Sequence, residues 1–254
     1  MQADLFKPKW LAAHLLVAGL VALFVSLGFW QLGRLEERRA LNAVIADRYN
    51  ADPVSLEALE GEPPAAIEYR RVLVNGVYLP AEEVLIRSQV YLGTAGFHVV
   101  TPMGGTSASS VLVNRGWVPL GVEEAPGSVA PPSQETTEIL GWVHLTQERP
   151  PLGPEEPPGD IDVMNRVDIN RIQTQVPYPL LDIYVVEISE NESGELPVTA
   201  APPDFTDEGP HFAYAFQWFG FALIAAVGYP FLIREKNRRP QSDGNGLANS
   251  STTS

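Results

Sequence analysis

The stretch HFAYAFQWFGFALIAAVGYPFLI, residues 211–233, decides the fold of this chain. None of its 23 residues carries a formal charge. At about 1.5 Å of rise per residue, a helix of this length reaches roughly 34 Å, enough to cross a hydrocarbon core of about 30 Å. Charged groups are costly in lipid, and backbone amides there must bond within their own segment. We therefore expect residues 211–233 to form a transmembrane helix.

A second uncharged run covers residues 10–33. It exceeds the apolar region of about 7–15 residues in a cleaved signal peptide, and it ends in bulky Phe29, Trp30 and Gln31 instead of a small-residue cleavage site. We expect a retained helix, and hence a membrane protein made of a two-helix transmembrane hairpin with a large extracytoplasmic β-rich (α+β) domain between the spans. The expected order is a cytoplasmic amino terminus at 1–9, spans at 10–33 and 211–233, the domain at 34–210, and a cytoplasmic tail at 234–254 that is first basic, then disordered.

Charges around the spans predict their orientation. Six Lys and Arg residues flank the terminal ends of the two spans, whereas three arginines follow the first span and only acidic residues precede the second. Cytoplasmic segments carry the excess of positive charge, so we expect a multi-pass protein with both termini in the cytoplasm. The short amino terminus favours a bacterial cell membrane over a mitochondrial one.

The segment between the spans is strongly acidic. Of 31 Asp and Glu residues, only Asp4, Glu235 and Asp243 lie outside residues 34–210, and that segment has no lysine. Nucleic acid requires a basic face and is therefore excluded as a partner. The chain has no cysteine, which excludes disulfides, iron–sulfur clusters and cysteine nucleophiles. No metalloprotease, phosphate-loop or serine-hydrolase motif occurs, and no carboxylate pair has catalytic spacing, so we expect a protein that is not an enzyme.

Apolar alternation predicts a mostly β-structured domain after a helix that continues through 35–49 and ends before Asp52-Pro53. Gly104-Gly105 suggests a hairpin connection, and segments rich in Pro and acidic residues predict loops at 121–134, 150–160 and 190–210. Strands are expected at 67–79, 83–90, 96–103, 110–118, 137–145 and 181–189, with a short helix at 167–175.

Polar and aromatic side chains crowd the first two turns of the second span: His211, Tyr214, Gln217 and Trp218. A histidine at a helix amino terminus feels a positive partial charge that disfavours its protonation. Neutral imidazole is the form that binds a metal or haem iron. The alternative is an ordinary interfacial histidine, because membrane interfaces collect such residues.

The outer end of the first span carries Trp30, Gln31 and Arg34. Because the spans are antiparallel, this end is level with His211. Together the two ends could frame a haem site, with imidazole for the iron, indoles along the macrocycle and a guanidinium for a propionate. An aromatic belt with a snorkelling arginine explains the same residues without a ligand.

The remaining histidines have simpler interpretations. We expect His14 to be interfacial at the cytoplasmic end of the first span, and His98 and His144 to be structural residues in strands. In the stretch VLVNRGWVP at 111–119, Arg115 either fixes a buried carboxylate or carbonyl, or belongs with Trp117 to a contact surface for a partner protein.

Five motifs occur in order within this two-span frame: Gly28 with Trp30, Gln31 and Arg34; Tyr69-Arg70-Arg71-Val72 with Asn75-Gly76; Gly96 with Val99-Val100-Thr101-Pro102; the run from Val113 to Pro119; and His211, Tyr214, Gln217 and Trp218. In this order they resemble the Surfeit-locus protein family of cytochrome c oxidase assembly factors.

The resemblance implies a role in maturing the catalytic subunit of the haem–copper oxidase in the respiratory chain. It also implies haem a as the cofactor, since some bacterial members bind haem a through the histidine that corresponds to His211. Oxidase subunits or a respiratory supercomplex are then the expected partners, and the protein acts as a haem chaperone. The alternative is a membrane scaffold without haem. Residues 121–165 and 190–209 match no part of the family pattern.

Overall fold

The computed structural model describes residues 7–105, 109–121, 133, 135–153, 155–188 and 196–238. The expected disorder at the end of the tail and most of the expected loop at 121–134 lie outside these residues. The chain divides into two compact units, residues 1–42 with 206–254, and residues 43–205.

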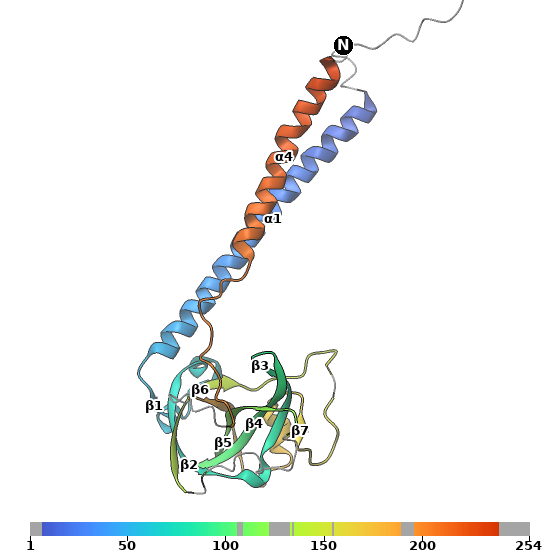
Figure 1. Ribbon diagram of the computed structural model, residues 1–254. Coiled ribbons are helices and arrows are strands. Elements are labelled where there is room, and N and C mark those ends of the chain that lie inside the picture. The colour runs from blue at the N-terminus through green and yellow to red at the C-terminus, as the bar shows by residue number, and fades with distance from the viewer. Residues whose placement is uncertain are drawn as a thin grey trace, which may run out of the picture. The chain divides into compact units, whose positions relative to one another are not determined.

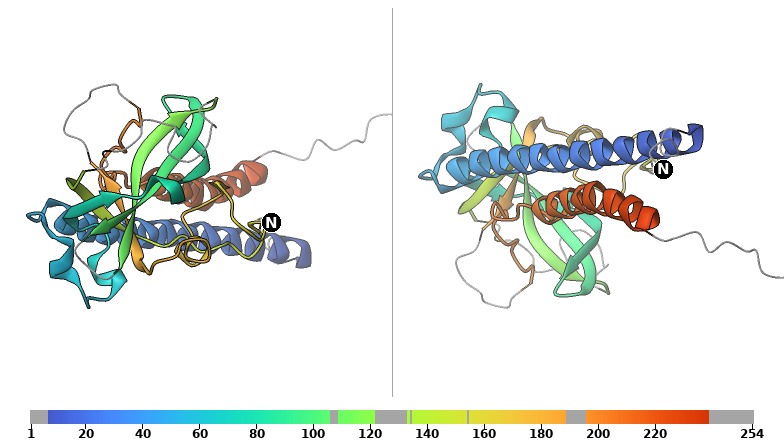
Figure 2. Two further views of the ribbon diagram at one scale, coloured as in Figure 1. Left: turned by 90° about the horizontal axis from the view of Figure 1, so that it is seen from below. Right: turned by 90° about the horizontal axis from the view of Figure 1, so that it is seen from above.

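Two long helices dominate the first unit. Helix α1 runs from Pro8 to Asn50 and helix α4 from His211 to Arg238, and they lie side by side (Figures 1 and 2). By length and composition, both are apolar enough to cross a membrane. Their outward faces expose large apolar side chains, including Leu16, Phe216 and Ile224. Such faces suit a lipid environment far better than water.

A heptad-like seam joins the helices. Buried or half-buried positions recur at alternating spacings of three and four, which keeps them on one face of each helix. Several seam residues are small, and small residues let the backbones of membrane helices approach closely. On α1 the seam comprises His14, Val17, Val21, Phe24, Gly28, Gln31, Leu35, Arg38 and Asn42, and on α4 it comprises His211, Ala215, Trp218, Ala222, Ala225 and Tyr229.

The second unit is built on one curved sheet with the strand order β1-β2-β6-β8-β5-β4-β3-β7, which closes on itself because β2 also pairs with β4. The strands are β1 (Val54–Ser55), β2 (Arg71–Tyr78), β3 (Val84–Tyr91), β4 (Thr94–Gly105), β5 (Ser110–Pro119), β6 (Thr137–Leu145), β7 (Val163–Met164) and β8 (Leu180–Glu187). The shorter helical pieces are η2 (Leu56–Leu59), α2 (Pro64–Ile67), η3 (Pro80–Glu82) and α3 (Ile169–Gln173).

Apolar residues fill both faces of this sheet. Along β5, Val111 and Val113 join one hydrophobic cluster, whereas Leu112 between them joins another. Successive side chains of a strand point to opposite faces, so a fully buried strand supplies two cores at once. Ile169 and Ile172 of α3 cover the second cluster.

The expected β-rich unit between two apolar helices is confirmed, and all six expected strands are present. The structure differs from the expected strand at 67–79 near its start. The short helix α2 occupies Pro64–Ile67, and Tyr69 has a φ of 67°, so β2 begins only at Arg71. The two-residue strands β1 and β7 were not predicted, because two residues give no detectable alternation. The short helix at 167–175 is α3, and Asp168 caps it by accepting a hydrogen bond from the Arg171 amide.

Candidate functional site

Asp207 and Glu208, just before α4, are hydrogen-bonded to α1, and we call these contacts the clasp. Arg38 and Asn42 of α1 both donate to the backbone carbonyl of Asp207, at 3.1 and 3.0 Å. Arg39 makes a two-pronged ion pair with Glu208, at 2.7 and 2.8 Å, and this bond holds the pKa of the Glu208 carboxyl below its ordinary value. An exposed ion pair contributes little stability, but two parallel hydrogen bonds to one carboxylate fix the relative position of the two side chains. The clasp therefore fixes the position of the first turn of α4 beside α1.

His211 then meets Gln31 across the helix seam. The Nδ1 atom of His211 lies 2.9 Å from the amide oxygen of Gln31. An amide oxygen only accepts hydrogen bonds, so Nδ1 is the donor in this pair, and in the neutral ring the lone pair is then on Nε2. In histidines that ligate metals, the ring nitrogen that does not bind the metal usually donates such a hydrogen bond, and this bond fixes the tautomer and the orientation of the ring. The arrangement leaves Nε2 as the nitrogen available to a ligand.

Gly209 lies next to the Nε2 edge of His211. It adopts a φ of 68°, and its amide donates to the Asp207 carboxylate at 2.8 Å. A Cβ atom here would lie 3.3 Å from Cδ2 and 3.5 Å from Nε2 of His211. Glycine thus satisfies a left-handed turn, and any larger residue would bring a Cβ into contact with this edge of the imidazole.

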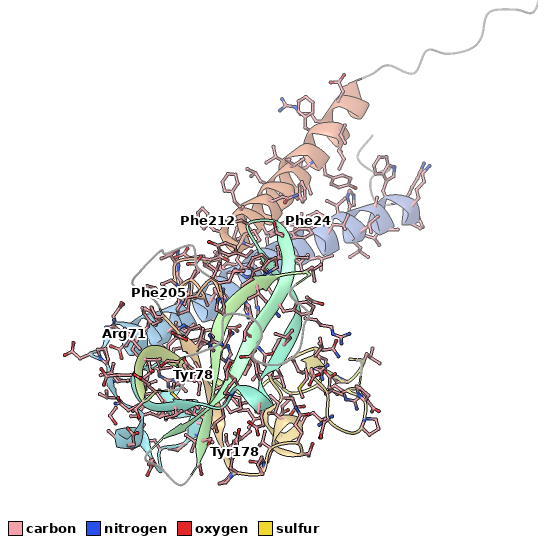
Figure 3. The ribbon with its side chains drawn as sticks, turned by 60° about the horizontal axis from the view of Figure 1, so that its bottom comes forward. Phe24, Arg71, Tyr78, Tyr178, Phe205 and Phe212 are labelled. Atoms are coloured by element: carbon pink, nitrogen blue, oxygen red, sulfur yellow. The ribbon has the colours of Figure 1, made fainter. Side chains whose placement is uncertain are left out.

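Aromatic rings line the pair below His211. On one side of the seam, Trp218 stacks on Phe24 with ring centroids 5.7 Å apart, and Phe221 contacts both. On the other side, Phe219 packs edge-on against Phe29 at 5.4 Å. Phe24 is labelled in Figure 3 on the α1 ribbon. The two sides of the seam therefore carry different aromatic residues, and we call the side with Trp218 the Trp218 side.

Four further candidate residues lie on the Trp218 side by helix geometry. Tyr214 is four residues before Trp218, and Gln217 is three after Tyr214, so they share one flank of α4. Arg34 is three residues after Gln31 and four after Trp30, which places it on the matching flank of α1. Trp30, Arg34, Tyr214 and Gln217 are exposed, and Arg34 pairs with Glu37 of its own helix. The residues form an open face and not an enclosed chamber.

The opposite end of the hairpin holds a second interhelix bond. Nδ1 of His14 lies 2.8 Å from the hydroxyl of Tyr229, and the Trp10 ring is 6.3 Å from the imidazole. His14 thus helps to hold the helices together at a distance from His211. It provides a natural comparison for His211 in experiments.

The other candidate surface, around Arg115 and Trp117, lies inside the strand unit. Arg115 is 8% exposed, pairs with buried Glu83 at 3.2 Å, and stacks over the ring of Tyr78. Trp117 is also 8% exposed and covers Gly96, where a Cβ would lie 2.5 Å from the indole nitrogen. Figure 3 labels Tyr78 among the strands. Burial of both side chains supports the alternative in which the arginine fixes a carboxylate, and it leaves little surface for a partner.

The two histidines of the strand unit sit in local packing. Asn114 donates to Nδ1 of His98 at 3.1 Å, and His144 stacks on Tyr184 with an interplanar angle of 6°. Burial lowers the pKa of both histidines, so both rest as neutral rings. Within the described residues, no group of three or more His, Asp or Glu could hold a metal ion.

Sequence reasoning missed the clasp and the role of Gly209. One signal was available, because the alternating spacing of the α1 seam continues past the apolar run through Leu35, Arg38 and Asn42. That continuation indicates that something packs against the helix there. The conformation of residues 207–209, which supplies the partner, could not be read from spacing.

Comparisons with known proteins identify the family of this chain. The model of the SURF1 family matches residues 18–223. A SURF1-like protein of Mycobacterium tuberculosis is 29% identical over 258 residues, covering 95% of this chain and 92% of the relative. A SURF1-like protein of Rickettsia felis is 24% identical over 231 residues, covering 85% and 94%. One from Monosiga brevicollis is 24% identical over 225 residues, covering 84% of each chain.

Proposed function

The chain belongs to the SURF1 family, and on that premise we propose that it is an assembly factor for the haem–copper cytochrome c oxidase that carries haem a to the catalytic subunit. SURF1 proteins are known generally as oxidase assembly factors. The residues at the end of the helix pair where α4 begins support haem a as the cargo.

One observation carries the proposal. The hydrogen bond between Nδ1 of His211 and Gln31 presents the lone pair of Nε2 beside a glycine. Haem iron binds such a neutral imidazole nitrogen. A purely interfacial histidine does not require a partner that fixes its ring orientation.

The surrounding residues suit a flat, amphipathic macrocycle. Trp30 and Trp218 offer aromatic surface, and Tyr214 with Gln217 borders the same side. Arg34 exchanges its exposed partner Glu37 for a propionate, because an exposed ion pair of this kind is weak. When bound, haem a supplies the redox-active iron that the oxidase requires.

The openness of this face fits transfer better than storage. A carrier must release its cargo, and a single histidine ligand on an exposed face holds haem less tightly than two ligands in an enclosed chamber. The excess of Lys and Arg near the two ends supports the proposal that both termini lie in the cytoplasm and the acidic strand unit lies outside. The protein then acts as a binding and transfer protein and not as an enzyme.

The test compares two histidine variants in a bacterium that makes haem a and lacks its own copy of this protein. His211→Ala should lower the haem a content of the purified oxidase, whereas His14→Ala should leave it near wild type. His14 is a matched control because it also bonds across the helix pair through Nδ1. Both variants must accumulate in the membrane to wild-type levels.

Full haem a content with His211→Ala would contradict the haem proposal. If that variant still co-purified with oxidase subunits, the protein would be a membrane scaffold that stabilises the oxidase or a respiratory supercomplex without carrying haem.

A further inference from the structure

The tip of the β3–β4 hairpin exposes a cluster of apolar side chains. The turn residues Leu92 and Gly93 connect the strands, and the last cross-strand pair is Tyr91 with Thr94. Val90 is 69% exposed and Leu92 is 88% exposed, with Tyr91 at 40% between them. We name residues 90–92 the apolar tip.

The turn itself does not require leucine. Leu92 and Gly93 have φ values of 46° and 80°, the left-handed conformation of a tight hairpin turn. Asn-Gly or Asp-Gly is strongly preferred there, since L-residues with larger side chains are strained in that region. Leu92 therefore combines backbone strain with an exposed apolar side chain, and neither improves the folding of the hairpin.

Charge also distinguishes this part of the domain. Residues 84–122 contain no Asp or Glu, although the segment 34–210 around them holds nearly all the acidic residues of the chain. The formal charges within residues 84–122 are Arg87 and the buried Arg115. Anionic lipid headgroups repel carboxylates, so a surface that approaches them must be free of acidic residues.

The chain limits how far the apolar tip can be from α4. Val198 exchanges both backbone hydrogen bonds with Trp117, at 2.7 and 2.8 Å, and the Trp117 ring lies 5.4 Å from Tyr91. Twelve residues lie between Val198 and His211, so the thirteen steps along the chain give a maximal extended reach of about 45 Å. This short connection allows the apolar tip to reach a membrane that α4 enters.

We propose that the apolar tip inserts into the headgroup–hydrocarbon boundary of the membrane that holds α1 and α4. Val90 and Leu92 bury apolar surface there, and Tyr91 takes the interfacial position that tyrosine prefers. The hairpin becomes a third point of attachment beside the two helices.

The experiment uses the complete chain, which has no cysteine of its own. L92C and, as control, L152C are labelled with an environment-sensitive fluorophore and reconstituted into vesicles of phosphatidylcholine and phosphatidylglycerol with nitroxide-bearing lipid. Leu152 is a matched control because it is a fully exposed leucine of the same unit, at 101%. The label at position 92 should emit at shorter wavelength and be quenched severalfold more strongly than the label at 152.

Equal, weak quenching at the two positions, with emission typical of water, would overturn the proposal and leave a protein partner as the occupant. A second variant separates lipid contact from damage to the turn. Leu92→Asn introduces a residue that the turn favours, so the protein should stay folded, while a label placed by V90C should lose part of its lipid quenching. Unchanged quenching at position 90 would also contradict the proposal.

Discussion

At the scale of single residues, the bond between Gln31 and His211 fixes how the imidazole is held at the end of the helix pair where α4 begins. It joins two residues 180 positions apart in sequence and occupies Nδ1 of the imidazole, so Nε2 is the nitrogen left for a ligand. Outer-shell partners of this kind orient a ligating histidine and raise its basicity. The site is therefore a pair of residues, and His211 alone describes only half of it.

Gln31→Leu should weaken haem binding without removing the ligand. The leucine keeps the approximate size of the side chain but accepts no hydrogen bond from Nδ1, so the imidazole loses its fixed orientation. Loss of such an outer-shell partner typically costs about 10–100-fold in affinity. Haem titration of the purified protein, followed by the Soret absorbance, measures the change, and an affinity equal to wild type would show that the Gln31 bond is irrelevant.

At the scale of elements, the helix pair depends on close approach at Gly28. A Cβ at this position would lie 2.6–2.9 Å from ring atoms of Phe219. Phe219 in turn contacts Phe29 on the same side of the seam. Contact this tight is possible only for glycine, which explains why a residue of low helix propensity occupies the middle of an apolar helix.

Gly28→Ala should destabilise the helix pair by about 1–3 kcal/mol, the usual cost of overpacking. Gly19→Ala is the matched control, since a Cβ at Gly19 meets nothing within 4 Å. Unfolding of each variant by titration with SDS from mixed micelles would compare them. Equal transitions for the two variants would mean that the Gly28 contact does not hold the helices together.

In the strand unit, a buried polar cluster links four strands, β2, β4, β5 and β8. Arg115 of β5 bonds to Glu83, which precedes β3, and Glu83 also accepts from Thr101 of β4. Arg115 stacks over Tyr78, whose hydroxyl donates to Glu187 of β8 at 3.1 Å. Burial raises the pKa of both Tyr78 and Glu187, so the tyrosine stays protonated as a donor.

Arg115→Met should destabilise the strand unit by about 3–5 kcal/mol, because it leaves the Glu83 carboxylate buried without its cation. The double variant Arg115→Met with Glu83→Met should recover much of this loss, since it removes both charges. Thermal unfolding of the three proteins in detergent measures the effect. A double variant no more stable than the single one would show that the ion pair is not the source of the loss.

At the scale of the whole molecule, the sequence predicts its layout well where periodicity is strong. Two long uncharged runs identify α1 and α4, and alternation places β6 at exactly the residues where it is found, Thr137–Leu145. The resemblance to the Surfeit-locus family is confirmed by the SURF1 match over residues 18–223. Each of these features can be recognised from the residues of one continuous segment.

The parts that escaped prediction depend on contacts between distant segments. Closure of the sheet by pairing of β2 with β4 involves three residues on each strand, too few to leave a pattern. The clasp between Asn42 and the carbonyl of Asp207 uses a backbone acceptor that any residue supplies. Burial of Arg115 was one of two open alternatives, because a sequence shows that an arginine lies in a strand but not whether a carboxylate meets it.

The most direct test of the proposed haem site is the absorption spectrum of the detergent-purified protein from cells that make haem a, wild type beside His211→Ala. Wild type should show a Soret band, and the band should be lost or strongly reduced in the variant because the iron loses its nitrogen ligand. His14→Ala, prepared in the same way, should keep the band. A band of equal intensity in wild type and His211→Ala, or none in wild type, would contradict the assignment of His211 as the haem ligand.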